Sequence, residues 1–513
     1  MPIKLEFLQK LSLTLSITGI YMSEENTTLD EFAIRKQKLQ DITDAGIDAF
    51  GHRFTDFSHS EDVKATFVED AEEHIPAKVA GRILAVRKMG AKSIFMTLSD
   101  EQGTIQLFAN KAHMTEDDFA RFAKLDIGDI IGAEGRLFKT KTGEITVREF
   151  KYTILSKALR PLPEKYNGLK DVETRYRQRY LDLISNRDSS KTLRQRSLIV
   201  KEVRRYLEDQ NYLEVETPMM HPIPGGATAR PFVTHYNALD QKMYMRIAPE
   251  LYLKKLLVGG FEKVFELNRN FRNEGLSKRH NPEFTCLEVY EAFGDRRTMQ
   301  ELVEGLIQHC AQKVIGTLQI PNEAGEIIDF SKFTEIDYKD LVRERTVENW
   351  FELDNAERIK IAREMGAHVD DKAEELEITH EVYDKCIEQT LIQPTFVCRL
   401  PKEFVPLAKR CKKDSSLVDV YELIIDGKEI SPGYTELNDP IDQRQRLEDQ
   451  LERSKGTEEE ESGAIDEDFL TALEHGMPPA GGLGLGVDRL IMLLTGAANI
   501  RDVILFPQLK NRS

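Results

Sequence analysis

Apolar and polar residues alternate along residues 265–290, with one interruption by a basic segment. The alternation predicts two antiparallel strands, and the basic segment predicts a flexible loop between them. Side chains suited to a nucleotide gather in this loop and at the start of the second strand: Arg272, Glu274, His280, Asn281 and Phe284. Because guanidinium groups bind phosphates and aromatic rings stack on bases, the hairpin predicts a nucleoside triphosphate site.

A glycine-rich stretch, GGLGLGVDR, occupies residues 481–489 and ends in Arg489. Its glycines allow close backbone approach to a ligand, although the same pattern is also typical of a turn before a helix. Arg272 and Arg489 lie far apart in the sequence. We expect them to hold the two ends of one triphosphate, although each arginine taken alone is more typical of an ion pair.

Short alternating segments with glycine turns follow one another between residues 77 and 157, and they predict a small closed β-barrel. Phe95 and Gln106 fall on neighbouring predicted strands. An aromatic ring beside an amide suits single-stranded bases, by stacking and by hydrogen bonds to base edges. A phenylalanine in this position is also typical of a barrel core, so both interpretations of Phe95 stay open.

The rest of the chain divides around this barrel. Thr28 and Glu31 form a capping-box pattern, so residues 28–76 are expected to be a helical segment with a basic face. Residues 1–27 are expected to be a disordered extension, with Met22 as the working start. They lack the cleavage site of a signal peptide. A proline-punctuated linker is predicted over residues 158–185, and an α+β domain over 186–513 with a helical insertion at about 304–393.

Composition indicates an ordinary globular protein, with 40% apolar and 31% charged residues. The net charge of −17 argues against nucleic-acid binding through the whole surface. Residues 175–205 reverse this balance, and they are interpreted either as solvated helices or as an RNA-facing surface. The five cysteines show no CxxC spacing, which argues against a disulfide framework or structural zinc site and points to the cytoplasm. No apolar run is long enough to span a membrane.

Taken in order, these segments resemble the class II lysyl-tRNA synthetases of the bacterial type. The resemblance covers roughly Leu29 to Pro507 and rests on three motifs: YLEVETPMM at 212–220, FRNEG with RHNPEFT at 271–285, and GGLGLGVDRLIMLL at 481–494. It implies an α+β fold, with an N-terminal OB-fold barrel that binds the anticodon, through Phe95 and Gln106, and a class II antiparallel-sheet catalytic domain. It also implies a cytoplasmic homodimer, with Pro218 at the interface, that acts on tRNA-Lys and not on DNA.

The resemblance also implies a lysine pocket. Its residues would be Gly226, Glu250, Arg272, Glu288, Tyr290 and Glu436. The chemistry agrees, because a buried ammonium needs anionic partners, and Glu288 and Glu436 supply two carboxylates. Glu250 would face the α-amino group of the substrate.

The implied reaction is attack of the lysine carboxylate on the α-phosphorus of ATP, followed by transfer of the lysyl group to tRNA. Arg272 would bridge the α-phosphate and the carboxylate, and Arg489 would hold the γ-phosphate. Phe284 would stack on adenine, with Glu274, His280 and Asn281 fixing the nucleotide from the loop. Positioning and charge neutralisation carry such a reaction, and no protein nucleophile is needed.

Glu422 and Glu429 are candidate ligands for Mg²⁺, of which the resemblance implies up to three ions per subunit. Both could reach one metal cluster if a turn at Asp426-Gly427 folds the segment into a hairpin, since Mg²⁺ prefers oxygen ligands. In an arbitrary sequence these two residues would be ordinary surface carboxylates.

One position departs from the family pattern. Pro432 stands where an asparagine usually helps to hold the substrate carboxylate, and proline offers no donor. Three rival functions remain: an aspartyl- or asparaginyl-type synthetase, an enzyme that lysylates a protein, and a synthetase-like binding protein without catalysis. The last would predict losses among Arg272, Glu274, Glu429 and Arg489, all of which are present.

Overall fold

The computed structural model describes residues 30–69, 75–163, 169–227, 229–454 and 465–511. The chain forms two compact units, residues 1–169 and 170–513. The division falls within the predicted linker 158–185. The expected extension 1–27 and the expected helix cap Thr28 lie outside the described residues.

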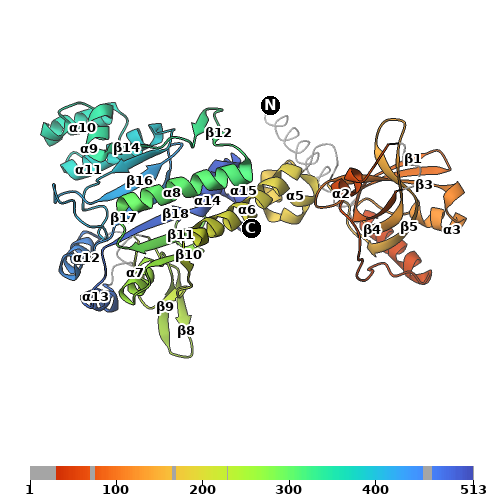
Figure 1. Cartoon of the computed structure of the whole chain (residues 1–513), viewed down its shortest axis with the longest axis horizontal. Coiled ribbons are helices and arrows are strands. Elements are labelled where there is room, and N and C mark those ends of the chain that lie inside the picture. Colours follow the sequence, from red (N-terminus) through yellow and green to blue (C-terminus); the bar gives the residue numbers. More distant parts are fainter. Residues whose placement is uncertain (1–29, 70–74, 164–168, 228, 455–464, 512–513) are drawn as a thin grey trace, which may run out of the picture. The chain divides into compact units, whose positions relative to one another are not determined.

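The first unit contains a closed five-stranded barrel with the strand order β1-β2-β3-β5-β4 (Figure 1). Its strands are β1 (Pro76–Met89), β2 (Ser93–Ser99), β3 (Thr104–Asn110), β4 (Ile130–Lys139) and β5 (Ile145–Ser156). Every second residue of β2 and β3 is buried, because successive side chains of a strand point to opposite faces. The barrel predicted between residues 77 and 157 is confirmed.

Short helices accompany the barrel. Residues 30–44 are helical, and the further helices are α2 (Ser60–Ala65), η1 (Lys111–His113) and α3 (Glu116–Phe122). Phe119 and Phe122 of α3 are buried in the same apolar cluster as the barrel interior. The helix thereby contributes to the barrel core.

The second unit is built on an eight-stranded sheet in the order β14-β15-β16-β17-β18-β11-β10-β6. Its strands are β6 (Leu213–Glu214), β10 (Lys263–Phe271), β11 (Glu283–Ala292), β14 (Thr334–Asp337), β15 (Thr395–Cys398), β16 (Val420–Ile424), β17 (Glu429–Thr435) and β18 (Ala480–Gly486). The strands pair antiparallel except at the two edges, where β14 with β15 and β6 with β10 are parallel. The expected antiparallel sheet and the hairpin within 265–290 are both confirmed.

Long helices cover one face of this sheet. They are α6 (Arg187–Asp209), α8 (Arg296–Cys310) and α14 (Val487–Thr495), and α6 packs against the other two. Ile199, Met299 and Leu490 from these helices share one apolar core with Phe265 and Leu287 of the sheet. The opposite face carries α7 (Glu250–Val258) and is hollowed by a cavity.

Other elements surround this framework. They are α4 (Val172–Arg177), α5 (Arg179–Ser185), η2 (Ala311–Ile315), α12 (Pro440–Ser454), α13 (Glu467–Glu474) and α15 (Ile500–Val503). The second half of the predicted linker 158–185 is therefore helical and belongs to the second unit. None of the helices in the described part of the chain combines the length and apolar character that crossing a lipid bilayer requires.

The expected helical insertion at 304–393 is narrower in the structure. Residues 304–310 complete α8, whose apolar face packs into the main core, and the hairpin of β12 (Gln319–Pro321) and β13 (Ile327–Asp329) follows. Apart from the end of α8 and η2, the helices of this range follow β14. They are α9 (Tyr338–Arg345), η3 (Trp350–Glu352), α10 (Asn355–Glu364), α11 (Glu375–Val382), η4 (Tyr383–Ile387) and η5 (Glu388–Thr390). They share an apolar core around Trp350 with Val397 of β15 and Val420 of β16.

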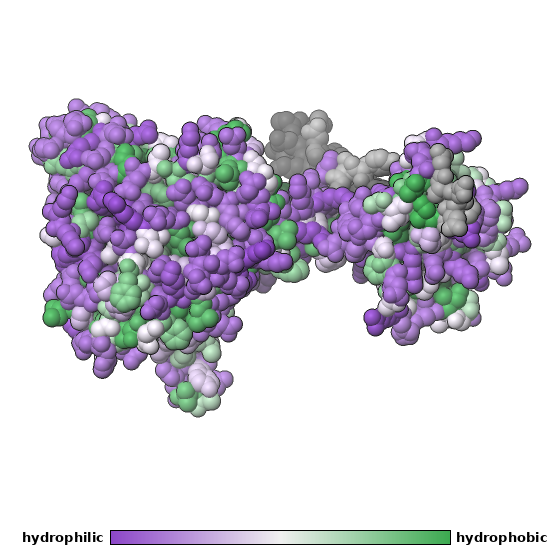
Figure 2. Space-filling model, in the orientation of Figure 1, coloured by the Kyte–Doolittle hydropathy of each residue, from purple (hydrophilic) through white to green (hydrophobic). Residues whose placement is uncertain are grey.

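A small sheet projects from the second unit, in the order β7-β9-β8. Its strands are β7 (Met220–His221), β8 (Val233–Tyr236) and β9 (Gln241–Met245). Met220, Val233, Tyr236 and Leu239 are exposed apolar residues of this sheet and its turn. Figure 2 shows hydrophobic residues at the tip of this projection, on a face that is otherwise largely hydrophilic.

Candidate active site

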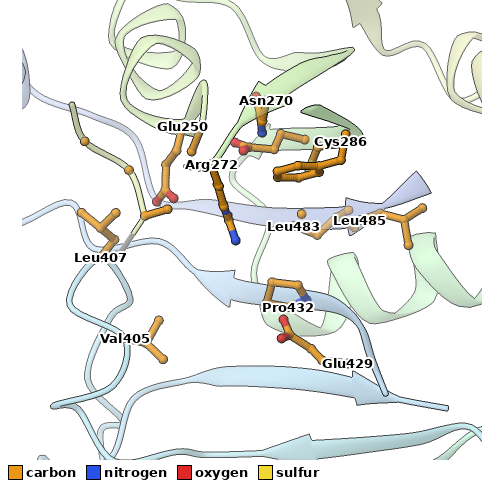
Figure 3. Close-up of a pocket in the computed structure, with 18 of the residues that line it drawn as sticks. Glu250, Asn270, Arg272, Cys286, Val405, Leu407, Glu429, Pro432, Leu483 and Leu485 are labelled. Atoms are coloured by element: carbon orange, nitrogen blue, oxygen red, sulfur yellow. The ribbon is translucent and has the colours of Figure 1, made fainter. Parts of the chain in front are cut away.

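A cavity of about 700 Å³ lies on the open face of the large sheet. Strands β10, β11, β17 and β18 form its floor, and α7 and residues 403–407 form one wall. Figure 3 shows Glu250 and Arg272 on one side of the cavity, with Glu429 and Pro432 of β17 opposite them. Charged side chains from distant parts of the sequence therefore face one cavity.

Arg272 follows directly after β10 and projects into the cavity (Figure 3). Its backbone N–H donates to the carbonyl of Pro282 at 2.9 Å, which holds the two sides of the loop together. The guanidinium carbon lies 5.2 Å from the centre of the Phe284 ring. Its Nε is buried and has no acceptor among the described residues, so this donor is poised for an anionic ligand.

Arg489 contacts the loop between β10 and β11 through His280. One of its amino groups donates to the carbonyl of Glu429 at 2.8 Å, and the other lies 3.2 Å from Nε2 of His280. Burial and the charge of Arg489 lower the pKa of His280. A neutral His280 accepts from Arg489 at Nε2, while its Nδ1 lies 2.9 Å from the Ser277 hydroxyl.

The other predicted nucleotide residues also lie at the cavity. Glu274, Asn281 and Phe284 line it, and Glu274 is exposed. The Asn281 side chain donates to the carbonyl of Glu283 at 2.6 Å, which orients the amide. Its side-chain oxygen is buried and without a hydrogen-bond partner in the described structure.

Alternation along β11 places Phe284, Cys286, Glu288 and Tyr290 on the face that lines the cavity. The Tyr290 hydroxyl donates to Glu288 at 3.1 Å. Burial, together with the nearby charge of Glu250, raises the pKa of Glu288 to about 8. A carboxyl group that burial holds protonated is poised to ionise when a cationic ligand arrives.

Glu250 and Gly226 complete the lining on this side. Glu250 is the first residue of α7 and is 6% exposed, with its carboxylate directed into the cavity (Figure 3). Gly226 has a φ of 86°, and a side chain there would stand 3.2 Å from the Glu250 Cβ. Glycine thus provides both the left-handed backbone and the close approach.

Glu436 lies behind this wall. It is fully buried and is not among the residues that line the cavity. Its carboxylate stands 2.6 Å from the ammonium of Lys254, which also lies 2.7 Å from Glu250. Sequence reasoning missed Lys254, although its position four residues after Glu250 on a helix was a usable signal.

The hairpin predicted around Asp426 and Gly427 is present, and both turn residues have positive φ, 54° and 61°. It brings Glu422 and Glu429 to the cavity. Burial, followed by the charges of Glu429 and Glu388, raises the pKa of Glu422. The Tyr383 hydroxyl donates to Glu422 at 3.1 Å.

Glu388, from the helical segment, was not predicted. Its pKa is raised to about 7 by burial and by the charge of Glu429. Within the described ranges, no group of three acidic, histidine or cysteine side chains has the geometry of a formed metal site. The chemistry of Glu422 and Glu429 nevertheless fits a divalent cation, which would relieve the repulsion that raises the pKa of Glu422.

Comparison with protein families agrees with this geometry. Residues 171–510 match the family of tRNA synthetases class II (D, K and N), and residues 77–155 match the OB-fold nucleic acid binding domain. The chain belongs to this class II tRNA synthetase family.

Similarity to individual members extends over nearly the whole synthetase. The lysine–tRNA ligases of Staphylococcus saprophyticus and Staphylococcus epidermidis are both 48% identical to it, over 501 and 500 residues. That of Staphylococcus aureus is 47% identical over 501 residues. In each case 96% of this chain and 100% of the relative are covered.

The barrel of the synthetase carries Phe95 and Gln106 on its outer face. Phe95 is half-buried, with its ring centre 4.7 Å from that of Phe108 on β3 and 5.2 Å from the guanidinium carbon of Arg87. The Thr146 hydroxyl donates to the Gln106 side chain at 3.1 Å. The interpretation of Phe95 as a core residue is therefore wrong, because the barrel interior takes the alternate positions of β2.

The basic segment 175–205 is divided in the synthetase between buried and exposed residues. Arg179 and Arg196 are buried in ion pairs with Asp182 and Asp488. Lys191 and Lys201 lie on the exposed side of α6. The interpretation of the whole segment as solvated helices is therefore wrong for its two buried arginines.

Pro218 lies between β6 and β7, on an exposed part of the synthetase. Its carbonyl oxygen is 2.8 Å from Nε2 of the buried His221. The exposed apolar residues of the β7-β9-β8 sheet, Met220 among them, follow this proline. Its expected role at a dimer interface stays a prediction.

Proposed function

We propose that this synthetase is a lysine–tRNA ligase, which activates L-lysine with ATP and transfers it to the 3′ end of tRNA-Lys. One observation carries the choice of amino acid: two buried carboxylates, Glu250 and Glu288, line the cavity near Arg272. Lysine has two ammonium groups and one carboxylate, and this arrangement complements all three. The names of the staphylococcal relatives support the same substrate.

In the first step, a carboxylate oxygen of lysine attacks the α-phosphorus of ATP. A new oxygen–phosphorus bond forms, the bond to the β-phosphate oxygen breaks, and pyrophosphate leaves. Arg272 lines the same cavity as Glu250 and Glu288, and its partner-free Nε supports a bridge between the lysine carboxylate and the α-phosphate. Its charge stabilises the negative charge that develops during attack.

The other nucleotide contacts position the reactants. Arg489 is held by the carbonyl of Glu429 and by neutral His280, which suits a fixed contact with the γ-phosphate. Phe284 stacks on adenine, and Glu274 and Asn281 contact the nucleotide from the loop.

Glu422 and Glu429 would hold Mg²⁺, with up to three ions in each subunit. When bound, the metal neutralises charge on the triphosphate and helps to orient it. Tyr383 fixes the Glu422 carboxylate through its hydrogen bond.

In the second step, the 3′-terminal adenosine of tRNA takes the lysyl group and AMP leaves. The OB-fold barrel binds the anticodon, with Phe95 stacking on a base and Gln106 reading a base edge. The synthetase acts as a cytoplasmic homodimer, in which the segment around Pro218 and the apolar β7-β9-β8 sheet contribute to the interface. The exposed apolar residues of that sheet support such a contact.

ATP–pyrophosphate exchange, measured without tRNA for each of the twenty amino acids, tests the proposal. We expect exchange with lysine alone. Exchange with aspartate or asparagine would preserve adenylation but overturn the lysine pocket. No exchange with any amino acid would support a binding protein without catalysis. Phe95→Ala should leave lysine-dependent exchange unchanged and weaken tRNA charging, which separates the barrel from the adenylation site.

A further inference from the structure

Lys254 is a fully buried lysine that the adenylation steps do not use. It lies on α7, one helical turn after Glu250, and its side chain is 0% exposed. A buried ammonium is costly unless carboxylates and hydrogen bonds compensate it. Its surroundings therefore indicate its role.

Three partners surround the Lys254 ammonium, and they come from three segments. Glu250 lies at 2.7 Å, Glu436 at 2.6 Å and the carbonyl oxygen of Leu407 at 3.4 Å. The Glu250 carboxylate and the Leu407 carbonyl accept hydrogen bonds from this ammonium, and the Glu436 carboxylate forms an ion pair with it. Glu250 and Leu407 line the cavity on the same side in Figure 3. Lys254 thus ties α7, the wall at 403–407 and the segment after β17 together from behind.

The charges around the lysine end of the cavity can be counted. Glu250, Glu288 and Glu436 are buried carboxylates, and Lys254 is the cation in direct contact with two of them. Lysine brings two ammonium groups, while its carboxylate meets Arg272. With Lys254 in place, the three carboxylates are balanced by three positive charges, which are the Lys254 ammonium and the two ammonium groups of the substrate lysine. Without it, one buried carboxylate would lack a counter-charge.

We propose that Lys254 is a positioning residue of the lysine pocket, which holds Glu250 at the cavity wall and balances the third carboxylate. The role rests on the proposed function, because it presumes that lysine is the substrate. Lys254 touches neither substrate; it acts through Glu250 and Glu436. Its removal should therefore impair lysine binding more than ATP binding.

Lys255 provides a matched control on the same helix. It pairs with the exposed Asp468 at 2.6 Å, lies 3.6 Å from Asp466 and is 19% exposed. In pyrophosphate exchange, Lys254→Met should raise the KM for lysine at least about tenfold, because a buried charge loses its partner. The KM for ATP should stay within about twofold. Both constants should also stay within about twofold in Lys255→Met, since an ion pair to the solvent-exposed Asp468 contributes little.

Two further variants distinguish positioning from general stability. Lys254→Met with Glu436→Gln removes both charges, and it should bind lysine better than Lys254→Met alone. In Lys254→Ala, added n-propylammonium should lower the KM for lysine, whereas propan-1-ol of the same length should not. Both results would show that lysine binding depends on the charge balance at the position of the Lys254 ammonium, and not only on a side chain that fills the space.

Several outcomes would overturn the proposal. One is an unchanged KM for lysine in Lys254→Met, and another is an equal rise of the KM values for lysine and for ATP. A third is a double variant that binds lysine no better than Lys254→Met, together with no rescue of Lys254→Ala by n-propylammonium. Absence of lysine-dependent exchange in the unaltered protein would instead reject the proposed function. Thermal unfolding of every variant identifies those that fail to fold, and the double variant then carries the test.

Discussion

Lysine binding should release a proton through Glu288. Burial, and next the charge of Glu250, raises the pKa of this carboxyl from 4.5 to about 8 in the empty pocket. The hydrogen bond from Tyr290 and the charge of Arg246 oppose the rise, and Glu266 adds to it. At pH 7 most molecules therefore carry a proton on Glu288, and this proton must leave before the carboxylate can pair with an ammonium.

The size of this pH effect follows from the difference of about one unit between pH 7 and the pKa of Glu288. Ionising a group with a pKa of about 8 at pH 7 costs about 1.4 kcal/mol. The apparent Kd for lysine should fall roughly fivefold between pH 7 and pH 8 and then level off. The ε-ammonium of free lysine stays charged in this range, since its pKa is near 10.4.

As pH rises, the contribution of Glu288 to folding stability changes in the direction opposite to that of lysine affinity. Because the pKa of Glu288 is higher in the folded empty protein than in the unfolded chain, stability due to this group falls as pH rises from 4.5 toward 8. Bound lysine should offset this loss. The stabilisation that lysine provides should thus increase over the same pH window.

Isothermal titration of the synthetase with lysine measures both quantities. Titrations in phosphate and in Tris, whose ionisation enthalpies differ, count the protons released. We expect nearly one proton at pH 7 and far less above pH 8.5. Glu288→Gln cannot ionise, so it should bind lysine more weakly and release no proton here. Equal Kd values at pH 7 and pH 8 in the unaltered protein, with no proton released, would refute the reasoning.

Three further predictions concern the rest of the site. Arg489→Ala should slow pyrophosphate exchange by about 100-fold or more while leaving the fold intact, because it removes a fixed positive charge from the phosphates; unchanged exchange would remove Arg489 from the site. Pro432→Asn should lower the KM for lysine by up to about tenfold, since a donor gains access to the substrate carboxylate; a raised KM would count against this contact. Asp488→Asn should lower the free energy of unfolding in urea by about 3–5 kcal/mol, because the buried Asp488 pairs with Arg196 and accepts from the Thr285 N–H at 2.7 Å. A loss below about 1 kcal/mol would mean that the pair contributes no more than a surface ion pair.

Features that depend on neighbouring residues could be predicted from the sequence. Alternation along residues 265–290 predicted the hairpin of β10 and β11. The same alternation places Glu288 and Tyr290 on one face of β11, which lines the cavity. The Asp426-Gly427 pair predicted the turn that brings Glu422 and Glu429 together. In these cases the geometry follows from the period of a strand or from a residue that tolerates positive φ.

Other features could not be predicted from the sequence, because long-range packing overrides the local pattern. Residues 304–310 look like the start of a helical insertion, but they continue α8, whose apolar face packs against the main sheet. Phe95 could be assigned to the outer face of the barrel only when the register of β2 was known. A slip of one residue would have buried it instead.

The sequence by itself thus determined the strands of the central hairpins, the barrel before the catalytic sheet, and the chemical types that meet at the site. Only the tertiary structure decided that Glu388 lies close enough to Glu429 for the charge of Glu429 to raise its pKa. It also decided that Tyr383 donates a hydrogen bond to Glu422, and that Lys254 pairs with both Glu250 and Glu436. The physical reason is distance along the chain. A strand or a turn is specified by adjacent residues, whereas the charge balance of a buried pocket depends on groups that only folding brings together.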